Sequence, residues 1–399
     1  MVSCLRLRIS MSMVVLSLAA LSAPPAMAVR FLTDPAPSTD TPRPIGYDNI
    51  AITPDGSQII ATGQFNGLLE GDRVYSVTIP ANPATQTVTP TQLSTSNFSV
   101  TYDVEDAPVV SPDGQTILFL HNGNSNGTDT IYQMPITGEG FATSTGLFAA
   151  DPNLVSPGIA NSDPVYSPNG QTIFFLNSES GFNGTIPDFD NPDDPAPFGD
   201  ADWDQLYSVP AGGGTPTPVT VPGDGDLDEG LYAVVPSGNA IVYAPDAPVE
   251  RLSNRGGQRT TLMSIPAGGG ASTPIAFPAP DHLFTIQDKL DVTPDGQSVL
   301  FLADYETQGQ VELFSLPIGG GTPTRVSGDL HFAGDVTNFE ISPDGASVAY
   351  VAGKTIGSAP ELFLKTLGSA APSVRISDPA TDNSGRGVSR TASGAVRFS

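Results

Sequence analysis

A phrase built around Pro-Asp-Gly returns along this chain and constrains the fold more than any other feature. Its copies are "ITPDGSQIIAT" from Ile52, "VSPDGQTILFL" from Val110, "YSPNGQTIFFL" from Tyr166, "VPSGNAIVYA" from Val235, "VTPDGQSVLFL" from Val292, "ISPDGASVAYV" from Ile341 and a weaker "SRTASGAVRFS" from Ser389. The residue before each glycine serves as a marker, giving Asp55, Asp113, Asn169, Ser237, Asp295, Asp344 and Ser393. Successive markers lie 49 to 68 residues apart. Self-similarity at this period indicates a repeat architecture.

Each copy predicts a hairpin turn followed by a buried strand. Proline fixes one φ angle and glycine permits a positive one, which suits these steps to tight turns. The run that follows, such as "TILFL" from Thr116, is β-branched, aliphatic or aromatic throughout, as expected of a strand buried between two stacked sheets. A third apolar strand comes next, as in "LYSVP" at Leu206 and "LFSLP" at Leu313.

A triple glycine ends that third strand in three copies. The phrases are "VPAGGGTPTP" from Val209, "IPAGGGASTP" from Ile265 and "LPIGGGTPTR" from Leu316. A phosphate-binding loop needs a helix after the glycines and usually a lysine, and neither pattern is present here. We therefore interpret the glycines as the turn between the third and fourth strands of one repeat.

Four short antiparallel strands in each repeat predict an all-β fold, a β-propeller of four-stranded blades. The sequence contains six full repeats and a seventh that stops after two strands. The N-terminal phrase "VRFLTD", residues 29–34, resembles fourth-strand phrases such as "VRISDP" from Val374. We expect it to complete the last blade, giving seven blades. Six blades and a tail form the alternative.

The phrases "SPDG…ILFL" and "LYSVPAGGGTP" resemble the repeats of TolB-type propellers and of the propeller domains of dipeptidyl peptidase IV-like hydrolases. The resemblance covers nearly all of the chain after residue 28. It implies the propeller alone, without the α/β domain that precedes the propeller in TolB. It likewise implies the propeller of the hydrolase relatives without their hydrolase domain, which carries the G-x-S-x-G elbow.

The first 28 residues are typical of a secretory signal peptide. Arg6 and Arg8 precede an apolar run, and "APPAMA" ends at Ala28 as a small-residue cleavage site. We expect residues 1–28 to be removed and residues 29–399 to form a single propeller domain, exported to the periplasm or outside the cell, with no transmembrane segment. The one cysteine, Cys4, would leave with the signal, so the mature chain would have no disulfide.

The chain is strongly acidic, with 42 Asp and Glu against 16 Lys and Arg and a net charge of −26. Such a charge repels nucleic acid and anionic lipid and attracts cations and basic surfaces. We expect a monomer with a protein or cation as partner, and no nucleic acid. A surface that is acidic only for solubility is the plainer interpretation.

Two neighbouring loops concentrate the acidic residues. The insertion from Asn177 to Asp204 contains "DADWD", and the following crossover contains "DGDLDEG" from Asp224. Crowded carboxylates attract hard cations, and flexible acidic loops suit Ca²⁺, which takes several oxygen ligands. The candidate Ca²⁺ ligands are Asp200, Asp202, Asp204, Asp224, Asp226 and Asp228. A solvated acidic loop is the alternative, and no other cofactor is expected.

The three histidines carry the competing hypothesis of an enzyme. His121 follows a second strand, and His282 and His331 each lie thirteen residues before a marker. The arrangement resembles propeller lyases that hold a metal with histidines and act on oligogalacturonide. The first hypothesis is an exported, non-catalytic propeller that binds a partner through its acidic loops, without catalytic residues. The alternative is a metal-dependent carbohydrate lyase or hydrolase, which requires the three histidines to converge.

Overall fold

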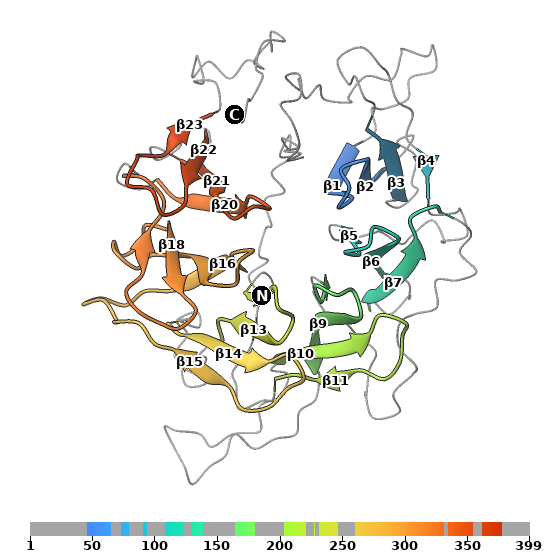
Figure 1. Cartoon of the computed structure of the whole chain (residues 1–399), viewed down its shortest axis with the longest axis horizontal. Coiled ribbons are helices and arrows are strands. Elements are labelled where there is room, and N and C mark those ends of the chain that lie inside the picture. The colour runs from blue at the N-terminus through green and yellow to red at the C-terminus, as the bar shows by residue number, and fades with distance from the viewer. Residues whose placement is uncertain are drawn as a thin grey trace, which may run out of the picture. The chain divides into compact units, whose positions relative to one another are not determined.

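The computed structural model consists of short antiparallel strands (Figure 1). The structure describes residues 46–64, 73–79, 91–93, 108–122, 129–138, 164–179, 203–220, 227, 231–245, 260–330, 334–353 and 361–376. Within these residues the strands form six sheets, five of four strands and one of three. None of the described segments is a helix of the length and apolar character that crossing a membrane requires.

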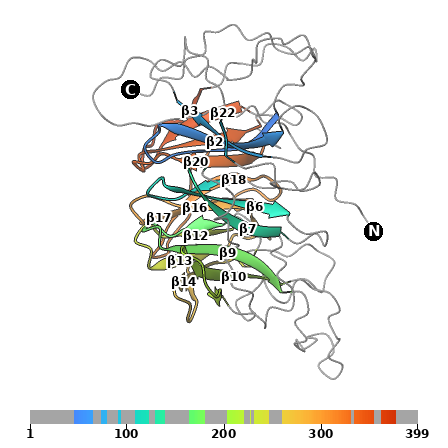
Figure 2. The same cartoon turned by 90° about the vertical axis from the view of Figure 1, so that its right-hand side faces the viewer.

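Each sheet is a meander in which the strands pair in chain order. The first three sheets comprise β1 (Gly46–Ile52), β2 (Gln58–Gln64), β3 (Arg73–Thr78) and β4 (Thr91–Gln92); β5 (Val109–Val110), β6 (Thr116–Asn122) and β7 (Asp129–Pro135); and β8 (Val165–Tyr166), β9 (Thr172–Glu179), β10 (Trp203–Pro210) and β11 (Thr217–Pro218). The antiparallel pair β9 and β10 is the longest pairing in the third sheet (Figure 2).

The last three sheets repeat this order. They comprise β12 (Tyr232–Val234), β13 (Ala240–Tyr243), β14 (Leu262–Pro266) and β15 (Thr273–Ile275); β16 (Ile286–Val292), β17 (Ser298–Ala303), β18 (Glu312–Pro317) and β19 (Thr324–Arg325); and β20 (Val336–Ile341), β21 (Ser347–Ala352), β22 (Glu361–Thr366) and β23 (Val374–Arg375). Every sheet begins just before its marker, so one repeat forms one blade, and the blades are numbered 1 to 6 below.

The prediction of seven blades is wrong, because the described residues form six. Blade 6 takes all four of its strands from a single repeat, and its fourth strand is the phrase at Val374. The six-bladed alternative therefore holds. The N-terminal phrase 29–34 and the seventh copy from Ser389 both lie outside the described residues.

The described residues fall into two compact units. The first contains residues up to His121 together with those from Met134 to 143, and the second contains residues 122–133 and those from 144 to 390. Blades 3 to 6 thus belong to the second unit, and their first strands adjoin one another from β12 to β16 and from β16 to β20.

The marker turns are built alike in five blades. At Asp295 the amide of Gly296 donates to the Thr293 carbonyl oxygen at 2.7 Å, and Gly296 has φ +68°. The Thr293 hydroxyl and the Gln297 amide donate to Asp295 Oδ1 at 2.6 and 3.0 Å. These bonds, the Thr293 bond first, lower the pKa of the Asp295 carboxyl, as equivalent bonds do at three other marker aspartates. The turn is therefore specified by Ser or Thr, Pro, Asp or Asn, and Gly together.

We expect Asp295→Asn to be tolerated and Asp295→Ala to lower the melting temperature. Blade 3 supplies the precedent, since Asn169 accepts from the Ser167 hydroxyl at 2.8 Å and the Gln171 amide at 3.0 Å. A carboxyl with a lowered folded pKa stabilises the fold above its unfolded pKa and loses that contribution as pH falls. Melting curves at pH 7 and pH 3 should show that Asp295→Asn removes part of the acid sensitivity. Equal melting temperatures for the Asn and Ala variants would contradict this account of the turn.

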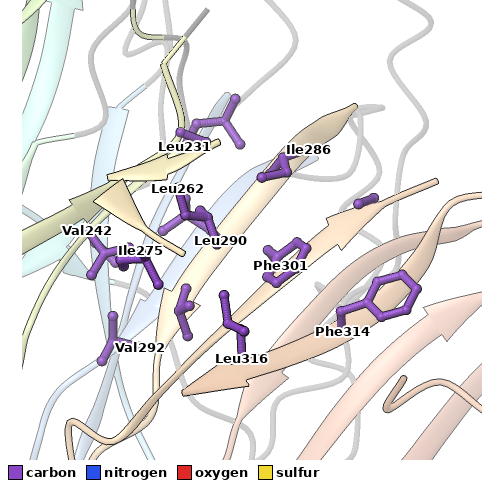
Figure 3. Close-up of a cluster of buried hydrophobic side chains, with 14 of the residues drawn as sticks. Leu231, Val242, Leu262, Ile275, Ile286, Leu290, Val292, Phe301, Phe314 and Leu316 are labelled. Atoms are coloured by element: carbon purple, nitrogen blue, oxygen red, sulfur yellow. The ribbon is translucent and has the colours of Figure 1, made fainter. Parts of the chain in front are cut away.

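The second strand β17 of blade 5 is buried on both faces, as predicted, whereas residues of β21 in blade 6 alternate between buried and half-buried. In β17, Val299 and Phe301 pack into the core between blades 4 and 5. Leu300 and Leu302, which alternate with them, pack into the core between blades 5 and 6. Figure 3 shows the first of these cores, where Phe301 lies among residues of β14, β16 and β18. Because successive side chains of a strand point to opposite faces, β17 contributes residues to two different cores.

The triple-glycine turn of blade 5, Gly319 to Gly321, is a hydrogen-bonded turn that also contacts the preceding blade. The Gly320 amide donates to the Pro317 carbonyl oxygen at 2.9 Å, and Gly320 has φ +86°. The Gly321 amide donates to the Ala276 carbonyl oxygen of blade 4, also at 2.9 Å. A Cβ at Gly320 would lie 2.6 Å from that same oxygen. The turn assigned from the sequence is confirmed, and the structure adds a contact between neighbouring blades.

Both kinds of turn lie at one end of each blade, which we call the marker end. The loops between second and third strands, and the crossovers between blades, lie at the opposite end, which we call the crossover end. This follows from the antiparallel strand order.

Candidate functional site

The structure describes few of the side chains that the sequence singled out. Asp204 lies half-buried in β10, and the other candidate Ca²⁺ ligands lie outside the described residues: Asp200, Asp202, Asp224, Asp226 and Asp228. In the part of the chain that is described, no three His, Cys, Asp or Glu side chains lie close enough together to hold a metal ion. The Ca²⁺ site therefore stays a prediction.

The two acidic segments do meet at one backbone contact. The Leu227 amide donates to the Asp204 carbonyl oxygen at 3.2 Å. Leu227 stands in the middle of "DGDLDEG", and its buried side chain packs with Leu206 and Tyr232 between blades 3 and 4. Leu227 is thus a buried apolar residue within the acidic crossover, bonded to the end of the insertion.

His282 is the histidine whose side chain the structure describes. Its Nε2 lies 3.1 Å from the carbonyl oxygen of Asp304. A carbonyl oxygen only accepts hydrogen bonds, so this nitrogen carries the proton and is not free as a metal ligand. The Asp304 carboxylate accepts from the amides of Thr285 and Gly309 at 2.6 and 2.9 Å. His282 therefore joins two loops of the crossover end.

The other two histidines cannot be placed beside His282. His121 is in β6 with its side chain outside the described residues, and His331 is outside them altogether. Their convergence on a metal, which the enzyme alternative requires, stays a prediction.

One arginine gathers three carboxylates at the crossover end of blade 5. Arg325 Nη1 lies 2.9 Å from Glu312 Oε1 and 3.2 Å from Glu306 Oε2, and Nη2 lies 2.6 Å from Asp329 Oδ1. Glu306 comes from the loop between β17 and β18, and Asp329 from the crossover after β19. We call these four residues the Arg325 network. Its net charge is −2 when all four are ionised.

The carboxylates of the Arg325 network differ sharply in exposure. Asp329 is 93% exposed and Glu306 44%, whereas Glu312 is only 1% exposed. Glu312 Oε2 is buried and has no hydrogen-bond partner among the described residues. Burial raises the pKa of Glu312, and the charge of Arg325 opposes that rise. The network is thus anchored by a desolvated carboxylate and presents two accessible ones to solvent.

Blade 6 repeats part of this arrangement. Arg375 Nη1 lies 2.6 Å from Glu361 Oε1, and Glu361 Oε2 is likewise buried without a partner among the described residues. Glu312 and Glu361 each begin a third strand, and each arginine sits on the neighbouring fourth strand. Sequence reasoning missed these pairs. The signal was the shared pattern "ELF" followed by Arg after the next turn.

A second charged cluster, also missed, lies on the adjoining first strands β16 and β20. Lys289 Nζ donates to the Phe339 carbonyl oxygen at 2.9 Å and contacts Glu340 Oε1 at 2.5 Å. Asp288 beside it has φ +63°, at a point where the register between β16 and β17 shifts. Burial raises the pKa of nearby Asp291. The signal was the polar step "DK" interrupting an otherwise alternating strand.

No protein-family model matches this sequence, and no curated protein matches it. Solved structures do resemble it. Oligogalacturonate lyase from Vibrio parahaemolyticus superimposes with a TM-score of 0.55 at 12% identity, over 84% of this chain and 78% of its own. The propeller domain of the Trilobed protease from Pyrococcus furiosus gives 0.52 at 11% identity, over 84% and 85%. A TolB-like protein from Agrobacterium tumefaciens gives 0.45 at 16% identity, over 72% and 83%.

At these identities the comparisons show the fold alone. Together with the six meander sheets, they establish that the chain is a β-propeller. The resemblance to TolB-type and peptidase-type propellers, first drawn from the repeats, is confirmed at that level. The same fold serves enzymes and binding modules, so function has to be argued from the site.

Proposed function

We propose that this chain is an exported, non-catalytic propeller that binds a basic partner through carboxylates at the crossover end of its blades. The observation that carries the proposal is the Arg325 network, in which three carboxylates from three segments share one guanidinium. The arginine holds these carboxylates in place, and an excess of negative charge remains for a partner. The net charge of −26 favours a basic partner over an acidic one.

The loops of blade 3 support the same proposal. The Leu227–Asp204 bond joins two segments rich in aspartate at the crossover end of that blade. Blade 3 thus bonds the start of its third strand to the following crossover, and in blade 5 Arg325 joins the loop before the third strand to the following crossover. A preorganised charged surface of this kind steers association with an oppositely charged partner and sets its orientation.

No specific feature of the described residues favours the enzyme alternative. The likeness to oligogalacturonate lyase is a likeness of fold at 12% identity. The one described histidine side chain uses its Nε2 to join loops.

The proposal is tested by chemical cross-linking in the envelope of the exporting cell, followed by mass spectrometry. The crossover-end variant Glu306→Gln/Asp329→Asn should lose a basic partner that the wild-type protein captures. The marker-end variant Asp295→Asn/Asp344→Asn removes the same charge at the opposite end and should retain it. Equal recovery of that partner with both variants, or capture only of acidic proteins, would overturn the proposal. Fractionation of the same cells tests export.

Ca²⁺ is the proposed stabilising ion for the acidic loops of blade 3. A ligand that binds only the folded state stabilises it by about 1.4 kcal/mol at a concentration tenfold above its Kd. We expect added Ca²⁺ to raise the melting temperature. The triple variant Asp224→Asn/Asp226→Asn/Asp228→Asn should lose the gain, which should also fade toward pH 4 as the carboxylates protonate.

Sodium chloride at matched ionic strength is the control for this Ca²⁺ effect, since general screening predicts an equal shift. Mg²⁺ should act more weakly, because it demands a tighter octahedral site. Calorimetry without heat of Ca²⁺ binding, together with a shift no larger than the salt control, would exclude the ion.

A further inference from the structure

An apolar groove opens at the outer edge of blade 4. Its volume is about 140 Å³, and its lining is mainly apolar, with the buried Leu262 and Ile275 and the more exposed Pro274, Phe277 and Ala279, together with Thr260, Thr261 and Ala276. For scale, an engineered cavity of about 150 Å³ takes up one benzene molecule. The groove therefore has room for a single aliphatic side chain.

Three aromatic side chains pack together beside the groove. Phe277 meets the rings of Phe284 and Tyr305 at centroid distances of 6.1 Å each. Leu283, beside Phe284, is 55% exposed, and among the described residues only Val374 is another large hydrophobic side chain with comparable exposure. Leu283 is thus an exposed apolar side chain next to the aromatic residues that border the groove.

The groove is linked directly to the Arg325 network. Tyr305 donates from its hydroxyl to the Pro278 carbonyl oxygen at 2.7 Å, which ties the crossover of blade 4 to the next loop of blade 5. Glu306 follows Tyr305 in the chain and lies 3.2 Å from Arg325. This surface therefore comprises the apolar groove and, connected to it through the contact of Phe277 with Tyr305, the exposed carboxylates of Glu306 and Asp329.

We propose that this surface binds an extended peptide segment of the partner, an inference that rests on the function proposed above. The segment places an aliphatic side chain in the blade 4 groove and, a few residues away, an arginine or lysine on Glu306 and Asp329. The apolar anchor supplies burial at the centre of the contact, and the charge pair fixes its direction. Charge complementarity selects this occupant over a second copy of the chain, because two molecules with a net charge of −26 repel each other.

The probe is a pool of fluorescent hexapeptides with one leucine and an arginine two to five residues after it. Fluorescence anisotropy with purified protein should detect binding that weakens as salt is added. Ala279→Trp fills the groove from an exposed position and should weaken binding about tenfold, as expected for loss of an anchor. Asp329→Asn, at a fully accessible side chain, should weaken it about threefold, as expected for an exposed charge pair. Pools with Leu→Ser or Arg→Glu should not bind.

Asp295→Asn is the matched control, since it removes the same charge at the marker end and should leave binding unchanged. The proposal is overturned by absence of binding, by indifference to Ala279→Trp, or by equal loss with Asp295→Asn. It is also overturned if the protein dimerises in ultracentrifugation and Ala279→Trp abolishes the dimer, because the groove would then hold a second copy. A cross-linked envelope partner that is lost on Glu306→Gln/Asp329→Asn but kept on Ala279→Trp would refute this docking surface and leave the proposed function standing.

Discussion

Replacing Gly320 by alanine is expected to destabilise the propeller strongly. The new Cβ would lie 2.6 Å from the Ala276 carbonyl oxygen and 3.3 Å from its amide nitrogen, so backbone rather than a mobile side chain would have to move. The φ angle of +86° adds a left-handed conformation that costs an L-residue about 1–2 kcal/mol. Overpacking adds about 1–3 kcal/mol, so a total loss near 3 kcal/mol or more is expected from urea unfolding.

Gly319→Ala is the matched control, one residue earlier in the same turn. Nothing lies within 4 Å of a Cβ built there, and its φ is not positive. Alanine at such a position stabilises by about 0.4–1 kcal/mol at most, because it restricts the unfolded chain. Gly269→Ala should fall between the two, since its nearest atoms on blade 3 lie at 3.4 Å. A Gly320→Ala protein as stable as Gly319→Ala would show that the blades are not held together through this turn.

The turns illustrate how far the sequence predicts this fold. Local chemistry specifies them, because proline, aspartate and glycine each restrict or extend the backbone at their own position. The triple glycine was correctly placed as the turn after the third strand. Its contact with Ala276 was not foreseen, because that contact depends on how closely two blades pack, which no local pattern records.

The number of blades, in contrast to the turns, was predicted wrongly from the sequence. The markers count repeats, and the phrase at residues 29–34 resembles a fourth strand closely enough to suggest a shared blade. Resemblance in six residues does not determine which sheet a strand joins, since pairing depends on register and on neighbours distant in sequence. The phrase at Val374, used as the model for that inference, pairs within its own repeat.

The candidate site was only partly predictable, for a related reason. The acidic residues in "DADWD" and "DGDLDEG" are close together in the sequence and therefore predicted a site. The residues of the Arg325 network are dispersed over 24 positions, from Glu306 to Asp329, and formed no recognisable pattern. Its members come together because a third strand and a fourth strand are neighbours in the blade. Once the meander order is known, the pairing of Glu312 with Arg325 follows, and without it these residues are isolated charges.

The Arg325 network also carries the second large effect, which is expected from Arg325→Met. Methionine preserves much of the apolar stem but leaves Glu312, at 1% exposure, without its cation. Removing one partner of a buried ion pair costs about 3–5 kcal/mol, and the lower end is expected here because Arg325 itself is 30% exposed. The matched variant Arg375→Met should cost about 1 kcal/mol, because Glu361 and Arg375 are more exposed, at 13% and 34%.

The pH dependence distinguishes a lost charge from lost packing. Burial already holds the pKa of Glu312 above its usual value, and removing Arg325 takes away the charge that opposes this rise. An acid with a raised folded pKa contributes stability below its unfolded pKa, near 4.5, and loses that contribution as pH rises through the folded pKa. The deficit of Arg325→Met should therefore be largest at pH 7 and shrink toward pH 4, where Glu312 is protonated.

Urea unfolding at both pH values measures this deficit, and Glu312→Gln supplies a further control. In the Arg325→Met background, Glu312→Gln removes the unpaired charge while keeping the shape of the side chain. It should recover most of the stability lost at pH 7. A deficit of equal size at pH 4 and pH 7, not relieved by Glu312→Gln, would mean that Arg325 stabilises blade 5 through contacts of its stem along β18. In that case its guanidinium would not be what holds Glu306 and Asp329 ready for a basic partner.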